Sequence, residues 1–134
     1  PLLIYQGRLN LLDRKPIEQG ILDYCAEQGV GFISFSPLAQ GLLTDRYLNG
    51  IPKDSRMAIG KFLREEQLTD DLLAYLQRLN TTAAARGETL AEMALAWILH
   101  LPGMTSVLVG ASSVAQLEKN MRCVSAQPFG ENEI

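Results

Sequence analysis

Three short apolar runs, separated by amphipathic helical stretches, constrain the fold of this chain more than any other feature. They cover residues 2–5 (LLIY), 30–35 (VGFISF) and 106–109 (SVLV). Short, nearly continuous apolar runs are typical of strands buried in a parallel sheet, and parallel strands need long connections that are usually helical. The order of the elements therefore predicts an α/β fold built from parallel β/α units.

The helical stretches between these runs carry recognisable start and stop signals. Pro16 suits the first position of a helix, and Gly29 suits the cap that ends the same helix. Thr69, followed by two carboxylates, predicts a second helix start. Capping boxes, in which two side chains satisfy free backbone N–H groups, begin at Thr89 (T-x-x-E) and Ser113 (S-x-x-Q). Val114, Leu117 and Met121 form the apolar face of the last predicted helix.

Two loops are candidates for ligand binding. Residues 37–68 contain several glycines and prolines and no sustained period, which predicts a long loop, and long loops in compact domains are often functional. The turn from Gly110 to Ser113 follows a strand and opens a helix, where free N–H groups and the helix dipole suit a phosphate. Ligands of parallel α/β folds bind at the carboxyl ends of strands, where both loops lie. The alternative for the second turn is a plain capped helix.

The charged residues of the long loop allow two interpretations. Arg46, Lys53 and Arg56 either clamp an anion, as arginine forks and lysine ammonium groups do, or form solvated surface charge. From the bare sequence, solvated surface charge is the better interpretation.

The remaining reactive side chains indicate no catalytic or metal site. His100, the single histidine, stands at the end of an apolar helix, where we expect a capping or surface role, and Trp97 lies on the apolar face of that helix. The sequence holds no cluster with metal-ligand spacing and no carboxylate pair at acid–base spacing. Cys25 and Cys123 are expected to be buried free thiols, and a disulfide would require the fold to bring them together.

Composition excludes several classes of partner. The chain is 47% hydrophobic and 20% charged, as soluble globular proteins are, and its net charge of −3 argues against nucleic acid or an anionic membrane. No apolar run approaches the length of about 20 residues that spans a bilayer. The N-terminal Pro-Leu-Leu-Ile has no basic region and no initiator Met. We therefore expect a cytoplasmic protein whose sequence begins inside a longer chain or has been processed.

Four segments, taken together and in order, resemble the aldo-keto reductase family over nearly the whole chain. They are residues 5–14, 35–43, 47–56 and 107–120. The likeness is greatest to the branch that holds bacterial glyceraldehyde-3-phosphate reductases and the β subunits of voltage-gated potassium channels. The family fold is a (β/α)₈ TIM barrel. The resemblance implies that residues 1–134 are one incomplete domain, made of barrel strands six to eight with their helices.

The resemblance also implies an NADP(H) site, residue by residue. Gln6 matches the glutamine that hydrogen-bonds the nicotinamide carboxamide, and Phe35 matches the aromatic residue that stacks on the nicotinamide ring. The other matches serve the phosphates and adenosine: Ser36, Leu38 and Gly41 in the loop over the pyrophosphate, Arg46 and Arg56 near the adenosine phosphates, and Ser112, Gln116 and Asn120 in the turn that holds the 2′-phosphate and adenine.

Three positions depart from the family pattern. Leu9 replaces the aromatic residue of Gln-x-x-Tyr-Asn, and Asp45 replaces the glycine before the basic residue of the covering loop. Lys119 replaces the glutamate that contacts adenine, which removes an acceptor from the adenine site.

The family's catalytic residues have no match in these 134 residues. Its members reduce carbonyls with an Asp, Tyr, Lys and His tetrad, in which Tyr is the general acid and the nicotinamide supplies hydride. Three hypotheses follow: an NADP(H)-dependent reductase whose catalytic half lies outside this sequence, a nucleotide-binding regulatory or interaction subunit, and a truncated non-catalytic protein. Three parallel strands cannot close a barrel, so we expect the open edges to pair with the rest of the barrel or with another copy.

Overall fold

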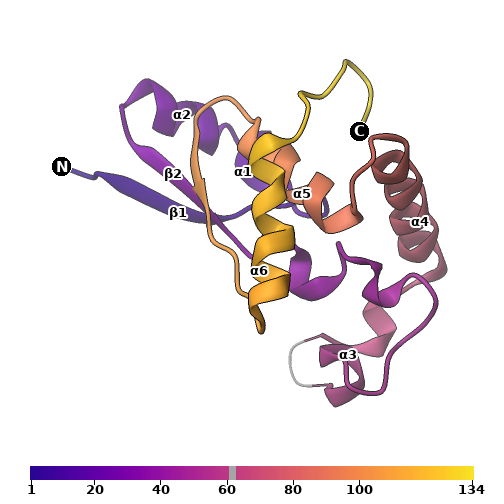
Figure 1. The fold of residues 1–134 in the computed structure, drawn as a ribbon. Coiled ribbons are helices and arrows are strands. Elements are labelled where there is room, and N and C mark those ends of the chain that lie inside the picture. The colour runs from indigo at the N-terminus through magenta and orange to yellow at the C-terminus, as the bar shows by residue number, and fades with distance from the viewer. Residues whose placement is uncertain (61–62) are drawn as a thin grey trace.

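A three-stranded parallel sheet organises the chain (Figure 1). The computed structural model describes residues 1–60 and 63–134, and of Arg56 the backbone alone. The strands β1 (Ile4–Arg8), β2 (Gly31–Phe35) and β3 (Met104–Val107) lie in the order β1-β2-β3, so the middle strand pairs with both neighbours and both edges are open. The predicted α/β class is confirmed, although β1 runs later in the sequence and β3 earlier than the apolar runs indicate.

The two faces of the sheet differ in burial. Gly7 pairs in register with Ser34, and both are buried under the helices. A Cβ at Gly7 would lie 2.7 Å from the ring of Phe32, so β1 and the buried Phe32 pack too closely for a side chain here. The alternate residues Gln6 and Phe35 point to the opposite face, which is exposed in this chain. Helices therefore cover one face, and the other stays open.

The first predicted helix is in fact two helices. α1 (Lys15–Glu18) and α2 (Ile21–Glu27) are separated at Gly20, whose φ of +70° interrupts the helical bonding. The prediction of one continuous helix is wrong because glycine enters the left-handed region at little cost, which helical periodicity does not reveal. Gly29, with a φ of +68°, follows the end of α2 as expected.

The threonine caps begin two long helices as predicted. Thr69 accepts a backbone N–H at the start of α4 (Asp70–Ala85), and Thr89 does so at the start of α5 (Leu90–Leu99). The Glu92 carboxylate returns a bond to the Thr89 N–H at 3.0 Å, which completes the capping box. α5 is buried along most of its length and packs against β3.

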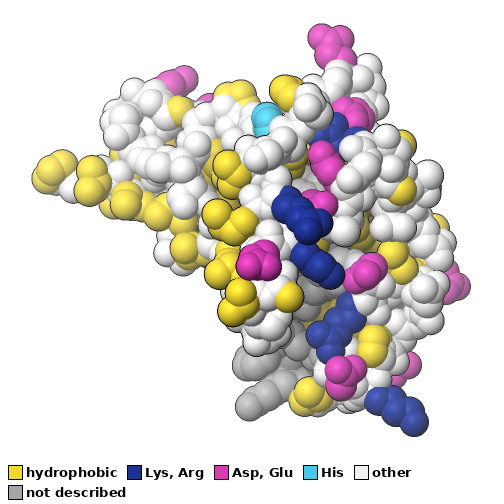
Figure 2. All heavy atoms as spheres, viewed as in Figure 1, with side chains coloured by type: hydrophobic (Ala, Val, Ile, Leu, Met, Phe, Trp, Pro, Cys, Tyr) yellow, Lys and Arg dark blue, Asp and Glu magenta, His cyan; other side chains and the backbone are white. Residues whose placement is uncertain are grey.

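The last helix, α6 (Val114–Met121), leaves its apolar face exposed. Figure 2 shows apolar side chains gathered over this helix at the molecular surface, beside a band of Lys and Arg side chains. Val114, Leu117 and Met121 are 74%, 43% and 57% exposed. The sequence correctly predicted an apolar face, but the described part of the chain provides no surface to cover it.

The long loop is not structureless. Its described residues form α3 (Arg56–Ile59) and three short 3₁₀ turns, and they contribute several buried side chains to the main core with α4 and α5. These are Leu42, Leu43, Tyr47, Met57 and Leu63. Burial of large apolar side chains gives a segment without regular periodicity a defined position.

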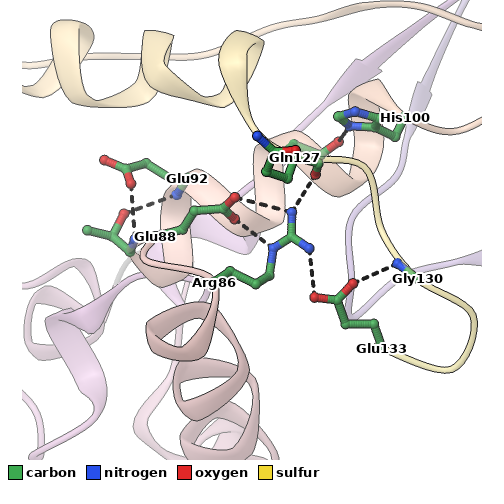
Figure 3. A network of polar contacts seen from close by, with 9 residues as sticks. Arg86, Glu88, Glu92, His100, Gln127, Gly130 and Glu133 are labelled. Atoms are coloured by element: carbon green, nitrogen blue, oxygen red, sulfur yellow. Dashed lines mark hydrogen bonds and ion pairs between the residues drawn. The ribbon is translucent and has the colours of Figure 1, made fainter.

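A buried arginine holds the C-terminal tail against α4 and α5 (Figure 3). The Arg86 side chain is 8% exposed and forms a fork with both carboxylate oxygens of Glu88, at 3.0 and 3.2 Å. It also donates to Glu133 at 2.7 Å and to the backbone carbonyl of Gln127, and it lies over the ring of Phe129. These contacts order a tail whose sequence carries only weak signals for regular structure.

Four singled-out side chains occupy ordinary structural positions. Cys25 and Cys123 are buried free thiols. His100 is the C-cap of α5 and lies with Nδ1 2.8 Å from the carbonyl of Ala96, as its place in the sequence predicts. Trp97 is partly buried between two apolar clusters. Of the helices in the described ranges, none combines the length and apolar character that a bilayer crossing requires.

Candidate cofactor-binding groove

The turn after β1 and the loop after β2 are tied together at the carboxyl ends of the strands. Asn10 donates from Nδ2 to the carbonyl of Ser36 at 2.9 Å. The Ser34 hydroxyl donates to the carbonyl of Leu9 at 2.7 Å, and it is fully buried. The start of the loop is therefore held by two bonds between residues about 25 positions apart in sequence.

The loop has an unusual backbone. Ser36, Ala39 and Gln40 have φ values of +51°, +48° and +60°, and Gly41 has a φ of +99°. Side chains other than glycine rarely adopt positive φ, and such residues cluster at ligand-binding sites. The three non-glycine residues with positive φ therefore mark this loop as a candidate ligand-binding segment.

A groove of about 1270 Å³ lies between this loop and α6. Its volume exceeds the 300–1,000 Å³ common for small-molecule sites, so an extended ligand has room. Seven of the ten predicted cofactor residues line it: Ser36, Leu38, Gly41, Arg46, Ser112, Gln116 and Asn120. Tertiary structure thus brings together residues from the loop after β2 and from the turn and helix after β3.

The polar groups at the start of α6 hydrogen-bond to one another in the wall of the groove. Ser113 caps the helix by accepting the N–H of Gln116 at 3.1 Å. The expected return bond of a capping box is replaced: Gln116 Oε1 accepts from the N–H and the hydroxyl of Ser112, at 2.7 and 2.9 Å. Apart from Gly110 and its two chain neighbours, no described residue has an atom within 4 Å of where a Cβ at Gly110 would be, so the backbone before the helix is open to a ligand.

Asn120 supplies an unpaired polar group to the groove. It is 5% exposed and lines the groove, and its Nδ2 has no hydrogen-bond partner among the described residues. A buried donor without a partner costs about 1–3 kcal/mol. A ligand that offers an acceptor at this point would remove that cost.

Of the three remaining predicted residues, Gln6 and Phe35 do not line the groove. Gln6 and Phe35 lie on the open face of the sheet as diagonal neighbours, since Phe35 pairs in register with Arg8, two residues after Gln6. Both are exposed, and Phe35 directly precedes Ser36 of the groove. Arg56 begins α3, and its side chain lies outside the described part of the structure.

Residues 1–134 match the sequence profile of the aldo/keto reductase family along their whole length. The chain belongs to this family. The family resemblance noted on four motifs is therefore confirmed.

Individual members of the aldo/keto reductase family are similar over the whole chain. The L-glyceraldehyde 3-phosphate reductase of Escherichia coli K12 is 46% identical over 138 residues, which cover 100% of this chain and 40% of that protein. A probable voltage-gated potassium channel subunit beta of Arabidopsis thaliana is 36% identical, with coverage of 95% and 40%. The chain thus spans about 40% of the length of these relatives.

A solved aldo-keto reductase has the same fold over this region. A thermostable aldo-keto reductase, crystallised with the inhibitor epalrestat, superposes with a TM-score of 0.69 at 23% identity. The match covers 99% of this chain and 38% of that chain. The open three-stranded sheet of this chain thus corresponds to part of a larger aldo-keto reductase fold.

The positions that depart from the family pattern differ in their surroundings. Leu9 is fully buried in a core cluster with Leu22 and Phe32, so this change is accommodated by packing. Asp45 and Lys119 both line the groove, on its opposite walls. These two changes therefore alter the charge of the candidate site itself.

Sequence reasoning missed other residues that line the groove. Thr44 donates to the carbonyl of Gly41 at 2.6 Å and accepts the N–H of Arg46 at 3.2 Å, so it supports the loop. Its place before Asp45, at the start of a 3₁₀ turn, is a capping signal that could have indicated it. Gln40 also lines the groove, and because positive φ at glutamine has no sequence signature, nothing in the sequence indicates it.

The described residues contain no group of three or more His, Cys, Asp or Glu side chains that could hold a metal ion.

Proposed function

We propose that this chain forms the NADP(H)-binding part of an aldo-keto reductase that reduces carbonyl compounds to alcohols. One observation carries the proposal: residues from segments about 70 positions apart line the same groove. The family motifs assign these residues to the cofactor phosphates and adenosine. Family membership and the relatedness to an L-glyceraldehyde 3-phosphate reductase support the reaction type.

The residues present fit such a cofactor. The N-terminal end of α6, with the open backbone at Gly110, suits a phosphate group, toward which the Ser112 hydroxyl would turn from Gln116. The unpaired Nδ2 of Asn120 suits an acceptor on the base or ribose. Gln6 and Phe35, on the open sheet face next to the groove, would hold and stack the nicotinamide, which supplies hydride when the cofactor is bound.

The proposal also concerns catalysis, which we do not assign to these 134 residues alone. None of their residues matches the family's catalytic tetrad, so we propose that this stretch by itself does not turn over carbonyl substrates. We assign it to barrel strands six to eight, in one incomplete domain. Its open sheet edges and the exposed face of α6 would be covered by the rest of the barrel or by a second copy.

Titration of the chain with NADPH tests the proposal. Binding is monitored by fluorescence, and the oligomeric mass of the chain in solution is measured alongside. We expect saturable binding by the 134-residue chain and about tenfold weaker binding for Ser112→Ala, because a hydrogen bond to a charged group is lost. Ser125→Ala is the matched control, since Ser125 is an exposed serine that does not line the groove. Arg56→Ala tests the family assignment of the 2′-phosphate contact.

Three results would contradict the proposal. A chain that shows no saturable NADPH binding lacks the site, whatever its oligomeric mass. Equal losses for Ser112→Ala and Ser125→Ala would show that binding does not occur at the α6 end of the groove. Oxidation of NADPH by the purified chain on addition of an aldehyde would contradict the proposed lack of turnover.

A nucleotide-binding regulatory or interaction subunit is the second candidate. The 36% identity to a probable voltage-gated potassium channel subunit beta favours it. In the full-length gene product, NADPH binding without carbonyl turnover would support this second function, and turnover would support the reductase.

A further inference from the structure

Arg46 is paired with a carboxylate of its own chain. Its Nη2 lies 3.2 Å from Oδ2 of Asp54 and donates to the backbone carbonyl of Asp54 at 3.1 Å. Both residues line the groove. The guanidinium that would meet a ligand phosphate is therefore already occupied by an internal anion.

The two walls of the groove differ in charge. Among the described residues of 44–54 that line the groove, Asp45 and Asp54 stand against one cation, Arg46, since Lys53 does not line it. The opposite wall, from residues 108–120, carries Lys119 and the N-terminal end of α6, with no carboxylate among its described lining residues. A diphosphate that enters the groove is attracted by the α6 wall, but it meets net negative charge on the other side.

We infer that Asp54 is an internal competitor for the anion site at Arg46 and that it limits the affinity of the groove for the diphosphate of a dinucleotide. On binding, the ligand's phosphate oxygens replace the Asp54 carboxylate at the guanidinium. The inference rests on the proposed function, because it concerns how tightly the same groove holds the same ligand.

The geometry makes this exchange inexpensive. The side chains of Arg46 and Asp54 are 45% and 84% exposed, so water and salt screen their attraction strongly. Because Nη2 also donates to the Asp54 backbone, the arginine keeps one anchor when the carboxylate leaves. A phosphate can in turn engage the planar guanidinium with two parallel bonds.

Paired variants test the inference. Asp54→Asn should tighten NADPH binding about two- to five-fold, the range expected when an exposed ion pair no longer competes. Asp45→Asn is the matched control, since it removes the same charge from the same wall and Asp45 makes no contact with Arg46 through its carboxylate in the described structure. The gain from Asp54→Asn should disappear in an Arg46→Ala background. Binding should also depend more steeply on salt in Asp54→Asn, because Arg46 is then free to pair with the ligand.

A parallel titration with inorganic pyrophosphate separates this inference from the proposed function. Tighter pyrophosphate binding by Asp54→Asn, with no NADPH binding by any variant, would support the competitor and overturn the cofactor assignment. Saturable NADPH binding with equal gains in the two aspartate variants, or a gain that survives Arg46→Ala, would overturn the competitor and leave the cofactor assignment standing. No binding of either probe would overturn both. Circular dichroism of each variant checks that the exposed substitutions leave the fold intact.

Discussion

The side-chain amide of Asn10 donates to the backbone carbonyl of Ser36 at 2.9 Å, and this bond joins the turn after β1 to the loop after β2. Its Oδ1 also accepts the N–H groups of Leu12 and Asp13, at 2.9 Å each. Asn10 is 1% exposed. Since Ser36 is the first residue of the loop that lines the groove, this one side chain positions the loop from a neighbouring strand.

Removal of the Asn10 side chain should therefore weaken both fold and groove. We expect Asn10→Ala to lower the free energy of unfolding by about 1–3 kcal/mol, because buried backbone groups lose their partners. Chemical denaturation measures this loss. Asn10→Asp keeps the acceptor for the turn but loses the donor to Ser36. We therefore expect it to reduce NADPH affinity even though the hydrogen bonds of the turn are kept. Unchanged binding and stability in both variants would show that the loop is positioned by other contacts.

Gly7 and Gly110 should respond differently to the same substitution. A Cβ at Gly7 would meet the Phe32 ring at 2.7 Å and the Tyr5 ring at 2.9 Å, so Gly7→Ala should destabilise the fold by about 1–3 kcal/mol through overpacking. A Cβ at Gly110 meets no atom within 4 Å, so Gly110→Ala should leave the melting temperature nearly unchanged while it weakens NADPH binding by crowding the phosphate. Thermal melting and NADPH titration of both variants measure the contrast. Equal melting temperatures for the two would contradict the packing argument.

Arg86 should control the order of the C-terminal tail. Its fork with Glu88 and its bond to Glu133 connect α4 to the last residues of the chain (Figure 3). Arg86→Lys keeps the charge but cannot form a fork, so amide hydrogen exchange in residues 126–134 should speed up, with a stability loss of about 1–2 kcal/mol. Arg78→Lys, on the same helix, is the control, because its described contact is a stacking arrangement with Tyr75 alone. Unchanged exchange in the tail of Arg86→Lys would show that the apolar contacts of Phe129 suffice.

Acid should release the tail through Glu133. The hydrogen bond from Arg86 lowers the pKa of the Glu133 carboxyl, and the Gly130 N–H adds to this effect. Because the folded pKa lies below that of the unfolded chain, the stabilisation is complete above the ordinary glutamate pKa of about 4.3 and is lost as the pH falls through the lowered value. The stability difference between the wild type and Glu133→Gln should therefore shrink on acidification. A difference that is constant across the acid range would contradict the role of this ion pair.

Local signals in the sequence predicted the elements well where a helix starts or a strand is buried. Thr69, Thr89 and Ser113 cap their helices as their types and positions indicate. The break at Gly20 and the positive φ at Gln40 were not predictable, because each depends on how distant segments must meet. Most residues of the candidate site were predicted from family motifs. Physical reasoning on the bare sequence identified only the two loops that carry them.

Local sequence accounts for the order of the β/α units, the helix caps, the apolar face of α6 and family membership, because capping, periodicity and motifs are properties of residues close together along the chain. The folding of the whole chain brings the residues after β2 and β3 into one groove, pairs Asp54 with Arg46, and lets Arg86 hold the tail. Contacts of this kind join side chains whose relative placement depends on the packing of whole elements.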